Sequence, residues 1–186
     1  MRTAPIQLLN ASFRRIAVEV DSRHIDDSVT STLDPHGLFE GVLIQTSVGC
    51  KELEQSDPRG TPYFVTLRVL IDNEEHTEYS EQRVSPYLID VEAGGMVVLA
   101  HGAERLGDPE DLVRVNGPAL LWSAVREVVA NATARMPLGM AFLPSVNFHD
   151  LKKDAPASGA EAATSAADAA DAADAPKPKR PRTKKS

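Results

Sequence analysis

The sequence predicts an α+β fold in which a four-stranded antiparallel sheet is followed by a short helix and a long helix packed on one face. Three observations support this class. Apolar and polar residues alternate in several runs before residue 92, whereas apolar residues recur with helical spacing between about residues 108 and 135. Turn-forming pairs such as Asp57-Pro58 and Gly94-Gly95 separate the runs.

The strand predictions rest on apolar residues at every second position, which place one face of each strand against a core. The first three runs cover residues 14–21, 38–48 and 63–71, and a fourth strand is expected over roughly 78–91, after a loop at 72–76. Short polar connections between consecutive strands favour an antiparallel meander. The apolar positions are Ile16, Val18 and Val20; Leu38, Val42, Ile44 and Val48; and Tyr63, Val65, Leu67, Val69 and Ile71.

The helical half begins at Asp108, a residue type favoured at the N-cap, followed by Pro109 in the first turn. The Asn-Gly-Pro sequence at 116–118 predicts the end of a short helix and the start of a longer one. In that longer helix Leu121, Val125, Val128 and Ala132 recur at i, i+4, i+7 and i+11 and form an apolar stripe.

The composition changes after Leu151, which divides the chain into a domain over 1–151 and a tail over 152–186. Residues 1–151 hold 12 Lys and Arg against 22 Asp and Glu, a net charge of −10, whereas the tail holds 8 against 5, a net of +3. The tail is an Ala- and Asp-rich linker ending in a basic Pro/Lys/Arg tip, and its few large apolar residues predict disorder. Two interpretations of the tip remain open, a solubilising extension or a contact with phosphate groups.

The sequence lacks the patterns that would indicate an enzyme. It has no Ser nucleophile elbow, no phosphate-binding loop and no zinc-ligand spacing among its five histidines, so no catalytic residue, metal or cofactor is expected. Cys50 is the only cysteine and is interpreted as a half-buried structural thiol. The single cysteine and the absence of an export signal or a long apolar run favour a cytoplasmic protein that does not insert into membranes. The acidic domain argues against specific nucleic-acid binding.

Four sequence features at fixed spacing resemble the protein-export chaperone SecB family. They are Gly117-Pro118, Leu120-Leu121-Trp122, Val125-Arg126-Glu127 and Val146-Asn147-Phe148. Gly117 replaces the family's Cys, and Ser145 replaces the Pro before Val-Asn-Phe. The stretch EAGGMVVLAHGAERLG, residues 92–107, is interpreted as an insertion before Pro118.

The resemblance implies an ATP-independent holdase that binds non-native polypeptides or preproteins in apolar grooves, for protein export. It also implies self-association into dimers and a tetramer through the long helix. The groove candidates are Ile44, Tyr63, Val65, Phe142, Leu143 and Phe148, and the interface candidates are Leu121, Trp122, Val125, Val128 and Val129. A core role is the alternative for Trp122, because tryptophan on an apolar helix face is usually buried.

The family docks on the translocase motor ATPase through acidic residues on its first and fourth strands. Glu19 matches one such position, whereas Arg15 and Gln82 occupy others. An alternative function is therefore a SecB-like chaperone dedicated to the antitoxin of a toxin–antitoxin pair.

Overall fold

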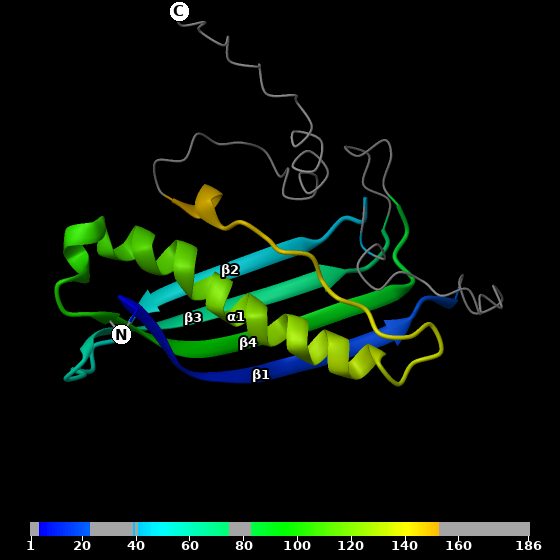
Figure 1. Ribbon diagram of the computed structural model, residues 1–186, viewed down its shortest axis with the longest axis horizontal. Coiled ribbons are helices and arrows are strands. Elements are labelled where there is room, and N and C mark those ends of the chain that lie inside the picture. The colour runs from blue at the N-terminus through cyan, green and yellow to red at the C-terminus, as the bar shows by residue number, and fades with distance from the viewer. Residues whose placement is uncertain (1–3, 23–38, 40, 75–82, 153–186) are drawn as a thin grey trace, which may run out of the picture.

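The computed structural model describes residues 4–22, 39, 41–74 and 83–152. Four strands, β1 (Ile6–Val20), β2 (Gln45–Glu52), β3 (Gly60–Ile71) and β4 (Tyr87–Ala100), form one antiparallel sheet, and α1 (Pro109–Thr133) crosses one of its faces (Figure 1). Short 3-10 turns, η2 (Ala103–Leu106) and η3 (His149–Leu151), flank the helical part. The α+β class and the four-stranded antiparallel sheet are thus confirmed. The predicted tail lies outside the described residues from 153 onward.

The strand order is β1-β4-β3-β2, which differs from the predicted meander. Strands β2, β3 and β4 are successive neighbours, but β1 pairs with β4, with Ile6 opposite Leu99 and Val20 opposite Tyr87. This is a Greek-key arrangement, in which one strand returns by a long connection to lie beside the far end of a meander. It makes β1 and β2 the two edges of the sheet.

Strand β1 begins eight residues before the predicted start at residue 14, because two irregularities conceal its alternation. The pairing with β4 shifts between Leu8 and Asn10 and again between Phe13 and Arg15. Each such bulge adds one residue and therefore exchanges the faces to which odd and even positions point. The inner-face positions are therefore even-numbered before the first bulge and after the second, as at Ile6 and Ile16, and odd-numbered between the two bulges, as at Phe13.

The boundaries of β2 and β4 also differ from the predictions. Strand β2 covers 45–52 rather than 38–48; only Val48 and Cys50 on its inner face are apolar. Strand β4 covers 87–100 and passes through Gly94-Gly95, so most of the expected insertion at 92–107 is strand. At Gly95 an added Cβ would overlap the Asn10 carbonyl oxygen, which explains why glycine occurs within this strand.

Helix α1 is continuous from 109 to 133, which corrects the prediction of two helices separated at Gly117-Pro118. It begins as predicted, because an Asp108 carboxylate oxygen accepts hydrogen bonds from the Glu110 and Asp111 amides at 3.0 and 3.1 Å. Pro118 lies inside the helix although it has no amide hydrogen to donate to the preceding turn. In that turn the Asn116 side chain donates a hydrogen bond to the Leu112 carbonyl oxygen at 2.7 Å.

The core lies between α1 and the inner face of the sheet. Its fully buried side chains come mainly from β3, β4 and α1: Leu67, Val69, Ile89, Val91, Leu121 and Val125. The outer face of the sheet carries ion pairs instead, with Arg15 and Arg68 at 2.7 and 2.9 Å from the Asp90 carboxylate. The two faces therefore differ in chemistry, and the apolar one determines how α1 packs.

Candidate functional site

Residues 138–148, here called the return segment, follow α1 and run back along it on the same side of the sheet (Figure 1). Three hydrogen bonds fix its antiparallel course. The Thr133 hydroxyl accepts from the Ala141 amide at 2.9 Å, the Arg126 Nε donates to the Leu143 carbonyl at 2.8 Å, and the Trp122 Nε1 donates to the Pro144 carbonyl at 2.9 Å. Side chains of α1 thus satisfy main-chain groups that have no sheet or helix partner.

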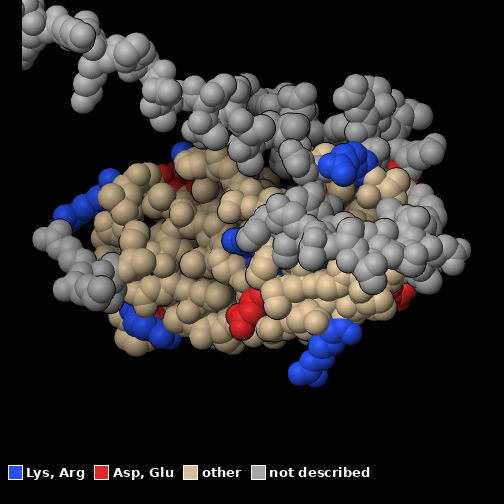
Figure 2. Space-filling view, turned by 45° about the vertical axis from the view of Figure 1, so that its right-hand side comes forward, with Lys and Arg blue, Asp and Glu red and all other residues tan. Residues whose placement is uncertain are grey.

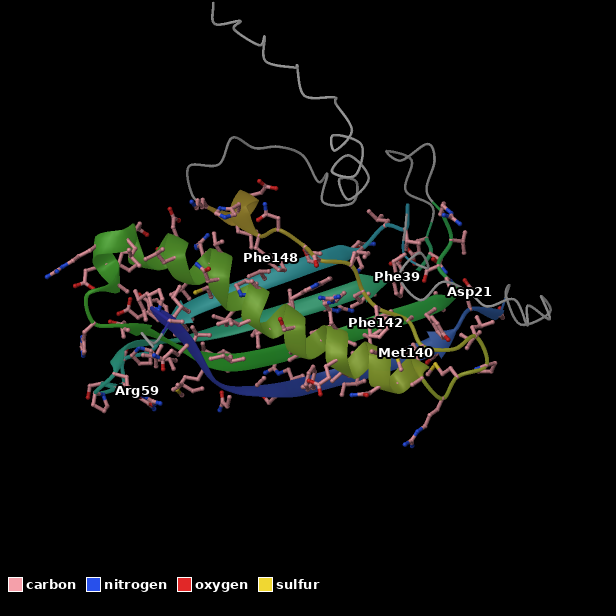
Figure 3. The ribbon with its side chains drawn as sticks, in the orientation of Figure 1. Asp21, Phe39, Arg59, Met140, Phe142 and Phe148 are labelled. Atoms are coloured by element: carbon pink, nitrogen blue, oxygen red, sulfur yellow. The ribbon has the colours of Figure 1, made fainter. Side chains whose placement is uncertain are left out.

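The predicted groove residues divide into two groups. Tyr63, Val65, Leu143 and Phe148 are buried in the core of the chain, whereas Ile44 and Phe142 are half-buried. Figure 3 shows Phe142 and Phe148 in succession along the return segment. Of the six groove candidates, Ile44 and Phe142 therefore remain accessible to a bound polypeptide, and the other four are buried.

Four of the five predicted interface residues of α1 belong to the core of the chain. Leu121, Trp122, Val125 and Val129 are buried within the chain, and Val128 is half-buried. The Trp122 ring also meets the Phe148 ring edge-on, with centroids 6.1 Å apart, which favours the core interpretation of this residue. Self-association through α1 stays a prediction, and it would use the exposed side chains of the opposite face: Asn116, Ala119, Ser123, Glu127 and Asn131. This side of the molecule has few charged residues over much of its area (Figure 2).

The two edge strands are the surfaces best suited to hold another polypeptide. Within the described residues, no strand pairs with the outer edge of β1 or β2, so alternate amides and carbonyls along each edge face outward. Apolar side chains lie beside the β1 edge on the inner face: Ile16 is 53% exposed, and Phe13 and Val18 are half-buried. Unpaired main chain next to apolar side chains is the surface used when a protein adds an extended peptide to its sheet.

The candidate motor contact, Glu19, is exposed near the end of β1 and pairs with Leu88 in the register. Arg15, four residues earlier, forms the ion pair with Asp90 described above. Gln82 lies outside the described residues. The part of β1 matched to the motor contact therefore carries an exposed acidic side chain, Glu19, and a cation, Arg15, that pairs with an acid of β4.

Two groups near β2, the Cys50 thiol and the Tyr63 hydroxyl, keep their protons at neutral pH. Burial raises the pKa of the Cys50 thiol above its ordinary value of 9.0, which disfavours the thiolate that a nucleophilic role requires. Burial, together with the neighbouring Glu52 carboxylate, raises the pKa of Tyr63 to about 12. Among the described residues no group of three or more His, Cys, Asp or Glu side chains is arranged to hold a metal ion. The described part of the chain likewise has no helix with the length and apolarity needed to span a bilayer.

Comparison with known proteins gives structural likenesses only. No family model matches the sequence, and no curated protein matches it. One similar solved structure is a protein of unknown function from Streptococcus agalactiae, with 10% identity, a TM-score of 0.44, and coverage of 75% of this chain and 96% of that one. Another is a SecB-like chaperone of Mycobacterium tuberculosis in complex with a peptide from an antitoxin, with 13% identity, a TM-score of 0.37, and coverage of 75% and 88%. With TM-scores below 0.5, neither likeness establishes a function.

Proposed function

We propose that the protein is a chaperone of the holdase type, which binds non-native polypeptides without ATP. The observation that carries this proposal is the outer edge of β1, a 15-residue strand with apolar side chains beside its unpaired main chain. The SecB-like sequence of α1 and the return segment, set out above, supports the same function.

The proposed mechanism is the addition of an extended client segment to the sheet. Main-chain hydrogen bonds to β1 do not depend on the client's sequence, and Phe13, Ile16 and Val18 contact its apolar side chains. A client held in this way stays unfolded because the segments that would pair with each other are occupied. The net charge of −10 over residues 1–151 favours clients with positive charge.

The predicted groove fits this mechanism as a second contact. Ile44 and Phe142 are accessible for apolar contact, whereas Leu143 and Phe148, which belong to the return segment and are buried, become available only when that segment moves off the sheet. We therefore expect them to contribute to client binding through a change in the position of that segment.

The test is suppression of the aggregation of an unfolded reporter protein, followed by light scattering in the absence of nucleotide. The variant Ile16→Lys places a charge at the β1 edge and is expected to reduce suppression several-fold, because charged residues oppose edge pairing. The matched control is Leu106→Lys, since Leu106 is 66% exposed but lies in η2, outside both edges. No suppression by the wild-type protein, or an equal loss in both variants, would refute the edge as the binding surface.

The finer alternatives are export and service to one antitoxin. Export requires binding to the translocase motor, and Glu19 is the candidate contact. Saturable binding of the motor that the variant Glu19→Lys abolishes would support a function in export. The pairing of Arg15 with Asp90 favours the alternative, since a cation occupies a position that is acidic in the family. Tight binding of one antitoxin, with no motor binding, would support that alternative. Both functions belong in the cytoplasm, and the mass in solution tests the proposed dimer or tetramer.

A further inference from the structure

The return segment is held by the rest of the chain in the way that a protein holds an extended peptide. Residues 139–148 belong to no helix or strand, and the main chain of residues 140–147 forms no hydrogen bond with the main chain of any other described residue. Side chains bind its main chain instead. Three of them, Thr133, Arg126 and Trp122, belong to α1. The fourth is Tyr87 of β4, whose hydroxyl donates to the Gly139 carbonyl.

The spacing of these hydrogen bonds requires a nearly extended backbone. Thr133 and Trp122 lie eleven residues apart on α1, which is about 16 Å of helix. Their partners, the Ala141 amide and the Pro144 carbonyl, end a run of four residues that spans at most ~14 Å. Pro144 favours this conformation, because its ring fixes its own φ and biases the preceding residue, Leu143, towards extended backbone.

Side chains of the return segment alternate between the core and the surface. Ala141 and Leu143 are fully buried and belong to the hydrophobic core. Met140 is 41% exposed, Phe142 is half-buried and Pro144 is exposed. Alternate side chains in pockets, together with hydrogen bonds to the main chain, are the contacts by which proteins recognise extended peptides.

None of the four hydrogen bonds depends on the sequence of the segment. Each joins a side chain of α1 or β4 to a main-chain amide or carbonyl, and every polypeptide carries these groups. The inward side chains, Ala141 and Leu143, are apolar, so small and aliphatic residues at alternate positions of another chain would provide the same burial. The site under the return segment therefore suits extended segments of many sequences, provided that no charged residue takes an inward position.

We propose that the return segment is an internal competitor of the client. In the free protein it fills a site that takes an extended, alternately apolar segment of a non-native polypeptide, and the client enters by displacing it. The free protein thereby keeps this apolar surface covered. The measured affinity for a client is then the affinity of the open site reduced by the fraction of molecules in which the site is open. This inference rests on the proposed holdase function and adds a second site to the β1 edge.

The hydrogen-bonding side chains serve both competitors. Replacing Trp122 or Arg126 would weaken the return segment and the client alike, whereas Pro144→Gly weakens only the segment. Glycine keeps the carbonyl that accepts from Trp122, but it removes the ring that favours extended backbone. This variant is therefore expected to bind a client about two- to fivefold more tightly. The matched control is Pro58→Gly, which replaces another exposed proline in the turn between β2 and β3.

Affinity is measured on the full-length proteins by fluorescence anisotropy. The probe is fluorescein-labelled ribonuclease A that has been reduced and alkylated with iodoacetamide, a basic polypeptide that cannot refold. Tighter binding by Pro144→Gly alone supports the competition. Equal affinity of Pro144→Gly and the wild type, or an equal gain in Pro58→Gly, would overturn it. No binding by the wild-type protein would refute the holdase function and this inference with it.

A nitroxide spin label reports the displacement directly and leaves the core unchanged. Ser145→Cys in the return segment and Ser123→Cys on α1 are introduced separately into a Cys50→Ser background, and both positions are exposed. Saturating unlabelled ribonuclease probe is expected to give the label at position 145 the rapid motion of a free segment, whereas the label at position 123 keeps its motion. Unchanged motion at position 145, with binding shown by anisotropy, would overturn the displacement and leave the holdase function intact.

Discussion

Gly117 of α1 lies directly against Val65 of β3, and a Cβ added to Gly117 would be 2.9 Å from Val65 Cγ2. Val65 is fully buried, so it has little room to move away. The absence of a side chain at Gly117 therefore permits the close approach of helix to sheet at this point. The glycine interrupts the helical pattern of the sequence for a reason of packing and does not end the helix.

The variant Gly117→Ala tests this contact. Alanine gains up to about 1 kcal/mol in helix propensity, whereas overpacking a buried site costs about 1–3 kcal/mol. We expect a net loss of about 1 kcal/mol in the free energy of unfolding, measured with urea. In a Val65→Ala background the same change should stabilise the protein. A gain in stability in the wild-type background would contradict the close packing.

A second prediction concerns Asn73, which is buried with a φ of 59°. Its side-chain amide donates to Asp21 Oδ2 at 2.7 Å and to the Ser85 carbonyl at 2.8 Å, and its Oδ1 accepts from the Ser85 amide at 2.8 Å. The variant Asn73→Ala is expected to cost about 2–4 kcal/mol, since it loses these bonds and strains the left-handed backbone. Asn73→Gly should cost about 1 kcal/mol less, because glycine adopts this φ freely. Thermal unfolding measures the stability of both variants. If Asn73→Gly were less stable than Asn73→Ala, the result would contradict the role of the left-handed backbone conformation.

A third prediction addresses the return segment. The variant Trp122→Phe keeps an aromatic ring beside Phe148 but removes the donor to the Pro144 carbonyl. Because hydrogen bonds of this kind contribute about 1 kcal/mol, we expect faster amide hydrogen exchange over residues 140–146 and little change in β3. Ser123→Ala, at the exposed neighbouring position, is the control. Unchanged exchange in the return segment would show that the Trp122 hydrogen bond does not hold it.

The fourth prediction is a pH dependence. Hydrogen bonds from Arg68, aided by the charge of Arg15, lower the pKa of Asp90. A carboxyl whose pKa is lower in the folded state stabilises the protein above the unfolded-state value, about 3.9, and this stabilisation is lost as the pH falls through the folded-state pKa.

We therefore expect Asp90→Asn to lower the melting temperature by roughly 2–4 °C at pH 7. The difference from wild type should narrow steadily below about pH 4. Melting curves between pH 7 and pH 2 provide the measurement, with Glu127→Gln as an exposed control. A difference that does not vary with pH would exclude ionisation of Asp90 as its source.

The class of the fold could be predicted from the sequence because β3 and α1 each bury one face, and burial imposes the periods of two and 3.6. The edges were less predictable. In β1 two bulges exchange the odd and even faces, and β2 has few apolar residues. Two pairs that usually interrupt secondary structure lie inside elements here, Gly94-Gly95 in β4 and Gly117-Pro118 in α1. At both pairs a side chain or main chain of an adjacent element approaches the glycine closely.

The candidate site was predictable only in part. An apolar side chain in a strand indicates a buried face, but it does not show whether a neighbouring element covers that face. Ile16 and Val65 have the same signal in the sequence, yet Ile16 is 53% exposed on an edge strand and Val65 is fully buried beneath α1. The strand order, which depends on long-range pairing, decides between the two outcomes. A surface pocket lined by Glu52, Tyr63, Leu99, Glu104 and Pro109 likewise brings together residues from β2, β3, β4, η2 and α1, and no local sequence pattern links them.

The pairing of β1 with β4 has a consequence for synthesis of the chain. Ile6 lies opposite Leu99, so β1 leaves the ribosome before the other three strands, and Ile6 has no partner until some ninety further residues have followed it. Contacts of such sequence separation form slowly, because a long loop must close first. During much of translation β1 is therefore itself an unpaired strand with exposed apolar side chains, which is prone to aggregate.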